Sequence, residues 1–126
     1  MLNPKKILVV EDDNELCDVL KYLFDIEGFI YDIRHDGTNI TKVVEKFKPD
    51  LMLFDYALPT KNGLKLCLEV KDNKAQRDLP VILYTAMPRA AIEDDDCYDS
   101  FIEKPFDLDE LINEIYRLLL LKPKSN

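Results

Sequence analysis

Acidic side chains follow two strongly apolar runs of the chain. Glu11, Asp12 and Asp13 come directly after the run 6–10, and Asp55 comes directly after the run 51–54. Two carboxylates about 4 Å apart repel by roughly 4 kcal/mol at an effective dielectric near 20. If folding brings these acids together, either one of them is protonated or a cation occupies the site. A site of oxygen ligands, without histidine or paired cysteine, favours Mg²⁺ or Mn²⁺ over zinc.

A hydroxyl group and an ammonium group occupy the ends of two later runs. Thr85 ends the apolar run that begins at Val81, and Lys104 ends the short run that begins at Ser100. A divalent cation and a lysine together can neutralise a phosphoryl group carried by a carboxylate. A threonine in such a place is usually only a β-former, and a lysine is usually a solvated charge. Their joint placement with the acids favours phosphoryl chemistry over these alternatives.

The acids have an alternative interpretation, in which they only cap the helices that follow and face water. This interpretation is preferred for Asp13, because it leads straight into the first predicted helix. For Glu11, Asp12 and Asp55 taken together, a shared binding site is the better explanation.

The apolar pattern predicts the elements that must position these side chains. Continuous apolar runs at 6–10, 51–54 and 81–84 are typical of strands buried on both faces. More polar or shorter strands are expected at 29–33 and 100–103. Apolar residues recur at helical spacing in the intervening stretches 16–23, 40–47 and 64–71, and again at 108–119 after Asp107.

This alternation predicts an α/β fold with a doubly wound, five-stranded parallel sheet and helices on both faces. The strand order 2-1-3-4-5 is taken from flavodoxin-like folds of this kind rather than derived. In that order the first and third strands flank the point where the connections reverse direction. The acids at the ends of those two strands then converge on the crevice where such folds bind ligands.

Four motifs carry a family resemblance. They are ILVVEDD at 7–13, DLMLFDYALP at 50–59 with Asn62-Gly63, VILYTA at 81–86 and FIEKPF at 101–106. Any one of them is weak, but the four in this order and at these spacings are highly specific. Along essentially its whole length, the chain resembles the receiver domains of two-component response regulators.

The resemblance implies an acceptor and a set of metal ligands. Asp55 is the implied phosphoacceptor. Asp12 is the implied direct ligand of Mg²⁺ (or Mn²⁺), and Glu11 acts on the metal largely through water. The backbone carbonyl of Ala57 is implied as a further ligand.

The resemblance also implies how the phosphoryl group is held and read. Thr85 and the amide of Ala86 would hold phosphoryl oxygens, and Lys104 would form a salt bridge. Phe101 stands at the position of the family's switch aromatic, which turns inward as Thr85 moves. The Lys104–Pro105 bond is expected to be cis, which is physically plausible because proline follows.

One segment departs from the family pattern. The stretch between Ala86 and Phe101 is about three residues shorter than is usual, close to one helical turn. It ends in the acidic run 93–96, and negative charge near a helix C-terminus opposes the helix dipole. The fourth helix should therefore be short or frayed. Because this region belongs to the family's signalling face, a monomer or weak dimer is expected rather than the family-typical dimer.

Bulk composition sets the class of protein. The 126 residues fit one receiver domain over 1–126, with a polar tail at 122–126. The net charge of −8 argues against direct nucleic-acid binding. The sequence has neither an apolar stretch of about 20 residues nor a signal-peptide core, so no membrane association and a cytoplasmic location are expected.

The cysteines predict neither a disulfide nor a zinc site. Cys17, Cys67 and Cys97 are odd in number, widely spaced and without a CxxC pair. Cys17 and Cys67 fall among apolar helical positions and are interpreted as small core residues of a protein in a reducing compartment.

The leading functional hypothesis is a phosphorylation switch, not an enzyme in the usual sense, that assists its own phosphorylation and autodephosphorylation. The expected donor is a sensor histidine kinase or a histidine phosphotransfer protein, and the output partner stays open. One alternative is a pseudo-receiver that serves only as a protein-interaction module. Another is a hydrolase with an aspartyl-phosphate intermediate, but Asp55-Tyr56-Ala57 lacks the second acid such hydrolases use.

Overall fold

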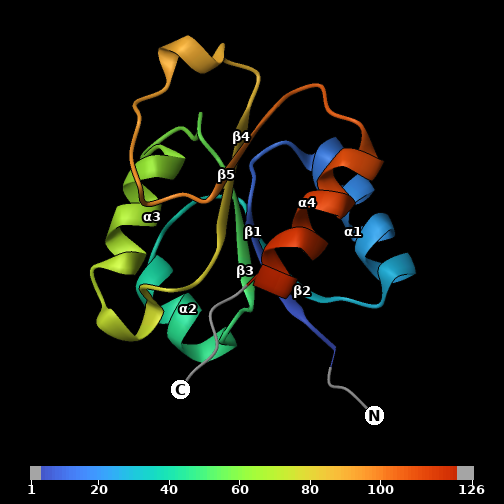
Figure 1. Cartoon of the computed structure of the whole chain (residues 1–126), viewed down its shortest axis with the longest axis horizontal. Coiled ribbons are helices and arrows are strands. Elements are labelled where there is room, and N and C mark those ends of the chain that lie inside the picture. Colours follow the sequence, from blue (N-terminus) through green and yellow to red (C-terminus); the bar gives the residue numbers. More distant parts are fainter. Residues whose placement is uncertain (1–3, 122–126) are drawn as a thin grey trace.

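The computed structural model describes residues 4–121 and places the apolar runs in one parallel sheet (Figure 1). The strands are β1 (Lys6–Val10), β2 (Ile30–Arg34), β3 (Leu51–Asp55), β4 (Val81–Thr85) and β5 (Ser100–Glu103). Their order in the sheet is β2-β1-β3-β4-β5, which confirms the predicted topology. The three central strands β1, β3 and β4 are the ones predicted to be buried on both faces, and nearly all of their residues are buried.

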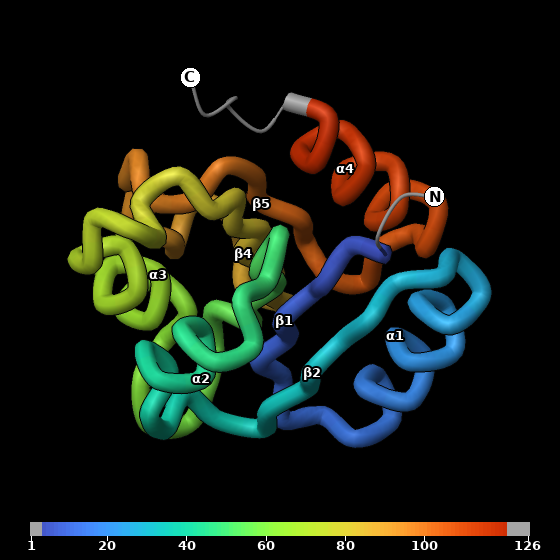
Figure 2. The backbone as a smooth tube through the Cα atoms, turned by 90° about the horizontal axis from the view of Figure 1, so that it is seen from below, coloured from blue at the N-terminus to red at the C-terminus, as the bar shows by residue number. Residues whose placement is uncertain are grey.

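Helices cover both faces of the sheet. They are α1 (Asn14–Glu27), α2 (Ile40–Phe47), α3 (Gly63–Lys71) and α4 (Leu108–Leu121), with single 3₁₀ turns η1 (Lys74–Gln76) and η2 (Arg89–Ala91). Figures 1 and 2 show α2 and α3 on one face and α1 and α4 on the other. The doubly wound arrangement is therefore confirmed.

Alternating side chains of the central strands fill two apolar layers. Leu8, Met52 and Leu83 point into the layer under α2 and α3. Val9 and Leu53 point into the layer under α1 and α4. Burying each such side chain contributes roughly 1.5–3 kcal/mol, and these layers hold the strand ends in register.

The first helix begins and ends at residues suited to those places. Asp13 Oδ1 accepts hydrogen bonds from the amides of Glu15 and Leu16, at 3.0 and 3.4 Å, so its predicted capping role is confirmed. Gly28 closes the helix at φ 81°, a left-handed conformation that costs glycine little.

The connection between β4 and β5 contains no α-helix, only the three residues of η2. The helix expected here to be short or frayed is thus reduced to a single 3₁₀ turn. Pro88 precedes the turn, and the acidic run 93–96 follows it in exposed positions, where it opposes continuation of a helix.

The prediction that the cysteines form no disulfide was wrong. Cys67 in α3 and Cys97, shortly before β5, are joined by a disulfide across a sequence separation of 30 residues. Two cysteines that are far apart in the sequence can still meet, because α3 and the chain before β5 both pack on the same apolar layer. Cys17 is free and buried, and Cys67 is buried, as predicted.

The third helix also differs from expectation at two positions. Leu68 belongs to the stretch 64–71, whose apolar residues recur at helical spacing, but it is 47% exposed, and the charged side chain of Lys71 at the end of that stretch is largely buried. Lys71 is buried because the segment around Cys97 lies against it, and the carbonyl of Cys97 accepts a hydrogen bond from its Nζ.

None of the helices within residues 4–121 is long and apolar enough to cross a membrane. The polar tail predicted at 122–126 lies outside the described residues.

Candidate functional site

Three acidic side chains meet at the carboxyl edge of the sheet. Glu11 and Asp12 follow β1, and Asp55 is the last residue of β3. One carboxylate oxygen from each lies within 4.8 Å of the other two. Glu11 and Asp55 are buried, whereas Asp12 is exposed. The predicted convergence of these acids is therefore confirmed.

Lys104, just after β5, reaches into the same site. Its Nζ lies 3.0 Å from Glu11 Oε1 and 3.2 Å from Asp55 Oδ2, and only 20% of its side chain is exposed. One ammonium group thus contacts two of the three acidic side chains of the cluster. The Lys104–Pro105 bond is cis, as expected.

Burial and the pairing with Lys104 both shift the pKa values of groups in this site. Burial raises the pKa of Asp55 and the charge of Glu11 raises it further, while the amide of Ala57 and the ammonium of Lys104 oppose that rise. Burial alone would lower the pKa of Lys104, but its hydrogen bond to Glu11 and the charge of Asp55 raise it. The site thus favours additional positive charge beside Asp55.

Both carboxyl groups of the buried acids are held by backbone amides. Asp55 Oδ1 accepts from the amide of Ala57 at 3.0 Å. Glu11 Oε2 accepts from the amide of Asp13 at 2.9 Å, while its Oε1 faces Lys104. Glu11 and Asp55 have therefore each engaged both oxygens with protein groups, and the exposed Asp12 is the more available ligand.

Helix α3 packs directly on the end of β3, the strand that carries Asp55. A Cβ at position 63 would lie 2.6 Å from the carbonyl oxygen of Asp55, so only glycine fits there. Asn62 caps α3 by accepting from the amide of Lys65 at 2.8 Å. The Asn62-Gly63 motif thus places α3 against the candidate acceptor.

Thr85 and Ala86 border the site at the end of β4. Thr85 is buried; its Oγ1 accepts from the amide of Met87 at 3.3 Å and its carbonyl accepts from the amide of Lys104 at 2.8 Å. Ala86 is exposed and lies at the rim of a hollow of about 430 Å³ that also reaches Lys104. The apolar wall of this hollow includes Leu16 and Leu108.

Phe101 does not join the carboxylate site. It pairs with Leu83 in the register and packs on the layer under α2 and α3, the face opposite to that of Leu53 and Tyr84. Phe101 is half-buried, and the guanidinium of Arg89 lies 5.3 Å from its ring centroid. Its predicted switch role remains a prediction.

Tyr84 is the site residue that sequence reasoning missed, because it was counted only as a member of an apolar strand. It pairs with Asp55 in the register, and Lys104 Nζ lies 4.8 Å from its ring centroid. Burial, and then the charge of Glu11, raise the pKa of Tyr84 well above its ordinary value. Its hydroxyl has no hydrogen-bond partner among residues 4–121. The aromatic ring of Tyr84 thus stabilises the ammonium group of Lys104 through a cation–π interaction.

Sequence comparisons place these features in a known context. Residues 7–116 match the profile of the response regulator receiver domain. The response regulator ArlR of Staphylococcus saprophyticus is 32% identical over 131 residues, covering 96% of this chain and 55% of that protein. The chain spans about half the length of the curated relatives it matches.

Two solved structures are similar along nearly the whole chain. The signal receiver domain of a signal transduction histidine kinase from Syntrophus aciditrophicus superposes with a TM-score of 0.86 at 29% identity, covering 97% of this chain and 95% of that one. The response regulator TrrA of Thermotoga maritima, solved in complex with Mg²⁺-BeF, gives a TM-score of 0.79 at 29% identity, with 90% and 98% covered.

Proposed function

The chain belongs to the response regulator receiver domain family, and we propose that it is a phosphorylation switch whose acceptor is Asp55. The observation that carries this proposal is the position of the Asp55 carboxylate. It is buried at the end of the central strand, in contact with Lys104 and close to two further acids. In a phosphorelay of this kind, the domain acts in signalling and assists its own phosphorylation and autodephosphorylation.

The donor set fits a divalent cation that prefers oxygen ligands. Asp12, Asp55 and the carbonyl of Ala57 would hold Mg²⁺ (or Mn²⁺), and Glu11 would act largely through water. The exposure of Asp12 leaves a path for the ion. When bound, the ion supplies positive charge beside the transferred phosphoryl group. The Mg²⁺-BeF complex of TrrA supports this choice of ion.

Phosphoryl transfer then places an oxygen of Asp55 in line with the phosphorus. The new O–P bond forms as the bond to the donor's leaving group breaks and that group departs with the electron pair. Lys104 already contacts Asp55 and is positioned to neutralise the added charge. The hydroxyl of Thr85 and the amide of Ala86 would donate to phosphoryl oxygens.

The conformational change caused by phosphorylation would pass to the face of the sheet that α2 and α3 cover. A phosphoryl group adds about −1.5 to −2 charge at pH 7, which draws Thr85 towards it. Thr85 now binds the amide of Met87, so this movement releases the start of the following segment. Phe101, two register positions away on the same face, would then turn inward from beneath Arg89.

The donor is proposed to be a sensor histidine kinase or a histidine phosphotransfer protein in the cytoplasm. The hollow between Lys104 and the apolar side chains of Leu16 and Leu108 gives such a donor a surface beside the acceptor. The domain is proposed to act as a monomer or weak dimer, through an output protein rather than through direct contact with nucleic acid.

Modification by acetyl phosphate tests the proposal. With Mg²⁺ present, the intact mass should rise by one phosphoryl group, and chelation of the metal should prevent this. Asp12→Ala should abolish both the labelling and the Mg²⁺-induced changes in the resonances of Asp55 and Ala57. Asp13→Ala is the matched control, because Asp13 only caps α1. Failure to label under any metal condition would instead identify a pseudo-receiver that acts as an interaction module.

A further inference from the structure

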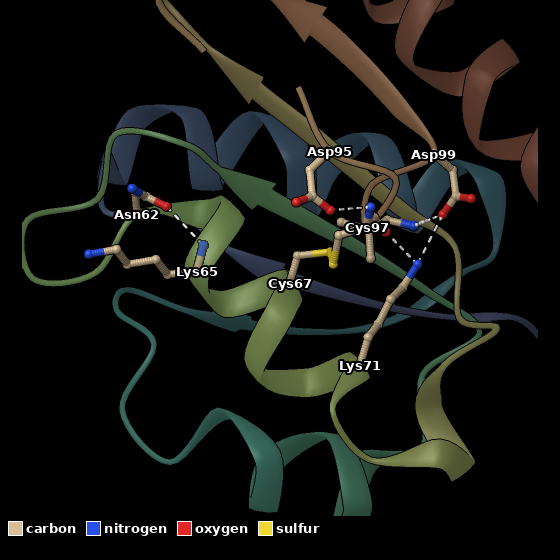
Figure 3. Close-up of a disulfide and its surroundings, with 8 residues drawn as sticks. Asn62, Lys65, Cys67, Lys71, Asp95, Cys97 and Asp99 are labelled. Atoms are coloured by element: carbon tan, nitrogen blue, oxygen red, sulfur yellow. Dashed lines mark hydrogen bonds and ion pairs between the residues drawn. A yellow bond between two sulfur atoms is a disulfide. The ribbon is translucent and has the colours of Figure 1, made fainter. Parts of the chain in front are cut away.

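We propose that Cys67 and Cys97 form a redox-active pair that controls the freedom of residues 86–99, which we call the output segment. The disulfide joins the middle of α3 to the C-terminal part of this segment, with Cα atoms 6.2 Å apart (Figure 3). The inference rests on the proposed function only where it connects this segment to phosphorylation.

The output segment has few attachments to the rest of the molecule before Cys97, whereas Lys71 and Val81 also hold its C-terminal end through hydrogen bonds with Cys97 and Asp99. Its only regular structure is η2, and most of its side chains from 86 to 96 are exposed. Arg89 forms an ion pair with Asp94 at 2.6 Å, but that contact is internal to the segment. Ile92 and Cys97 are its buried apolar side chains. The disulfide is therefore the covalent attachment of the segment to α3.

The surroundings of the disulfide favour exchange with an external thiol. Lys71 follows Cys67 by one helical turn, and its Nζ donates to the carbonyl of Cys97, at 2.5 Å, and to Asp99 (Figure 3). The amide of Cys97 is held by Asp95 Oδ1 at 2.8 Å. The ammonium group of Lys71 is thus held at the backbone of Cys97, and positive charge beside a cysteine favours release of its thiolate.

A hollow opens beside one of the two cysteines. It measures about 380 Å³, and Leu68, Lys71 and Cys97 are among its lining residues. Cys67 is not among them and is fully buried, whereas Cys97 is 7% exposed. The sulfur of Cys97 is thus the expected point of attack.

The reaction is a reversible thiol–disulfide exchange with a dithiol or two small thiols. The first external thiolate attacks Cys97 Sγ, the S–S bond breaks, and Cys67 leaves as a thiolate that takes a proton from water. The second external thiolate attacks the mixed disulfide and releases the thiolate of Cys97. The protein disulfide gains two electrons, and the external thiols are oxidised to a disulfide.

The position of the pair gives the exchange a regulatory consequence. The output segment begins immediately after Thr85, the residue proposed to move on phosphorylation. In a reducing compartment, a disulfide is usually transient and redox-sensing rather than structural. Reduction would remove the covalent attachment at the C-terminal end of the segment, and phosphorylation would act at its N-terminal end.

Hydrogen exchange on the full chain, oxidised or treated with dithiothreitol, tests the pair without any phosphodonor. Reduction should raise amide exchange severalfold in residues 86–99, with no comparable change at Asp12 or Asp55. Cys97→Ser should exchange as the reduced protein does and should not respond to dithiothreitol. Cys17→Ala should keep the full response, because it leaves the pair intact.

The outcomes separate this inference from the proposed function. Unchanged exchange in residues 86–99 on reduction, or three free thiols under oxidising conditions, would overturn the redox proposal whatever happens at Asp55. Loss of Asp55 labelling with an intact redox response would overturn only the phosphorylation switch. In the coupled case, beryllofluoride with Mg²⁺ should change exchange in residues 86–103 severalfold more in the reduced protein than in the oxidised one.

Discussion

The carboxylate site and the output segment are built in different ways, although they adjoin at Thr85 and Ala86. The site residues Glu11, Asp55 and Lys104 stand at the ends of strands or directly after them, and the buried sheet positions them. The output segment has one 3₁₀ turn and depends on side chains, above all on the disulfide at Cys97. The buried sheet thus holds the side chains of the carboxylate site, whereas the output segment is held by contacts that can change.

This difference has a thermodynamic meaning. Disrupting the site would require movement of the buried strands β1 and β3, each of which contributes to both apolar layers. Freeing the output segment requires breaking one disulfide, exposing the buried side chain of Ile92, and breaking the hydrogen bonds of Cys97 and Asp99 with Lys71 and Val81. Local opening of low free energy is expected in segments with few buried apolar contacts, and such segments commonly carry signals.

The largest expected effect concerns the disulfide. Reduction should lower the free energy of unfolding by about 2–4 kcal/mol, because the bond closes a loop of this length in the unfolded chain. Denaturant titration with and without reductant measures this difference. The Cys97→Ser variant should show no dependence on reductant; a dependence in that variant would show that the effect does not come from this bond.

A smaller effect is expected where α3 meets the acceptor strand. Gly63→Ala should destabilise the fold by roughly 1–3 kcal/mol, because its Cβ would overlap the carbonyl of Asp55. It should also shift the resonances of Asp55. Gly28→Ala is the control, since its Cβ would meet no atom within 4 Å and only the left-handed backbone is strained. Equal shifts at Asp55 in both variants would contradict the role of Gly63.

The smallest effect concerns the charge of Asp55 itself. Its pKa is raised mainly by burial, so the ionised form is less favourable in the folded than in the unfolded chain. The stability of the wild-type protein without metal should therefore fall as pH rises through this raised pKa. Asp55→Asn should be more stable than wild type at pH 7, and the two should converge in acid. Thermal unfolding across pH in a chelating buffer measures this, and a stability gain that persists in acid would exclude the charge as its cause.

Much of the fold could be predicted because apolar runs identify the buried strands. Much of the site could be predicted because its side chains lie at the ends of those strands. The apolar runs before Glu11 and Asp55 identify central strands, and the parallel order brings their ends together. The helical cap at Asp13 follows from local chemistry. These inferences need only the period of the apolar pattern and the direction of the strands.

The features that could not be predicted depend on pairs distant in the sequence. The pairing of Cys67 with Cys97 requires knowledge of how α3 packs against the chain before β5. The place of Lys71 follows from the same packing. Tyr84 resembles any aromatic residue of a buried strand until its register partner, Asp55, is known.

Locating the phosphoryl group is the most direct test of the account. The full chain should be treated with acetyl phosphate and Mg²⁺, the acyl phosphate trapped by reduction, and the peptides mapped by mass spectrometry. The label should lie on Asp55 alone, Asp55→Asn should carry none, and Asp13→Asn should label as the wild type does. Labelling that persists in Asp55→Asn, or a label on another acid of the wild-type chain, would contradict the assignment.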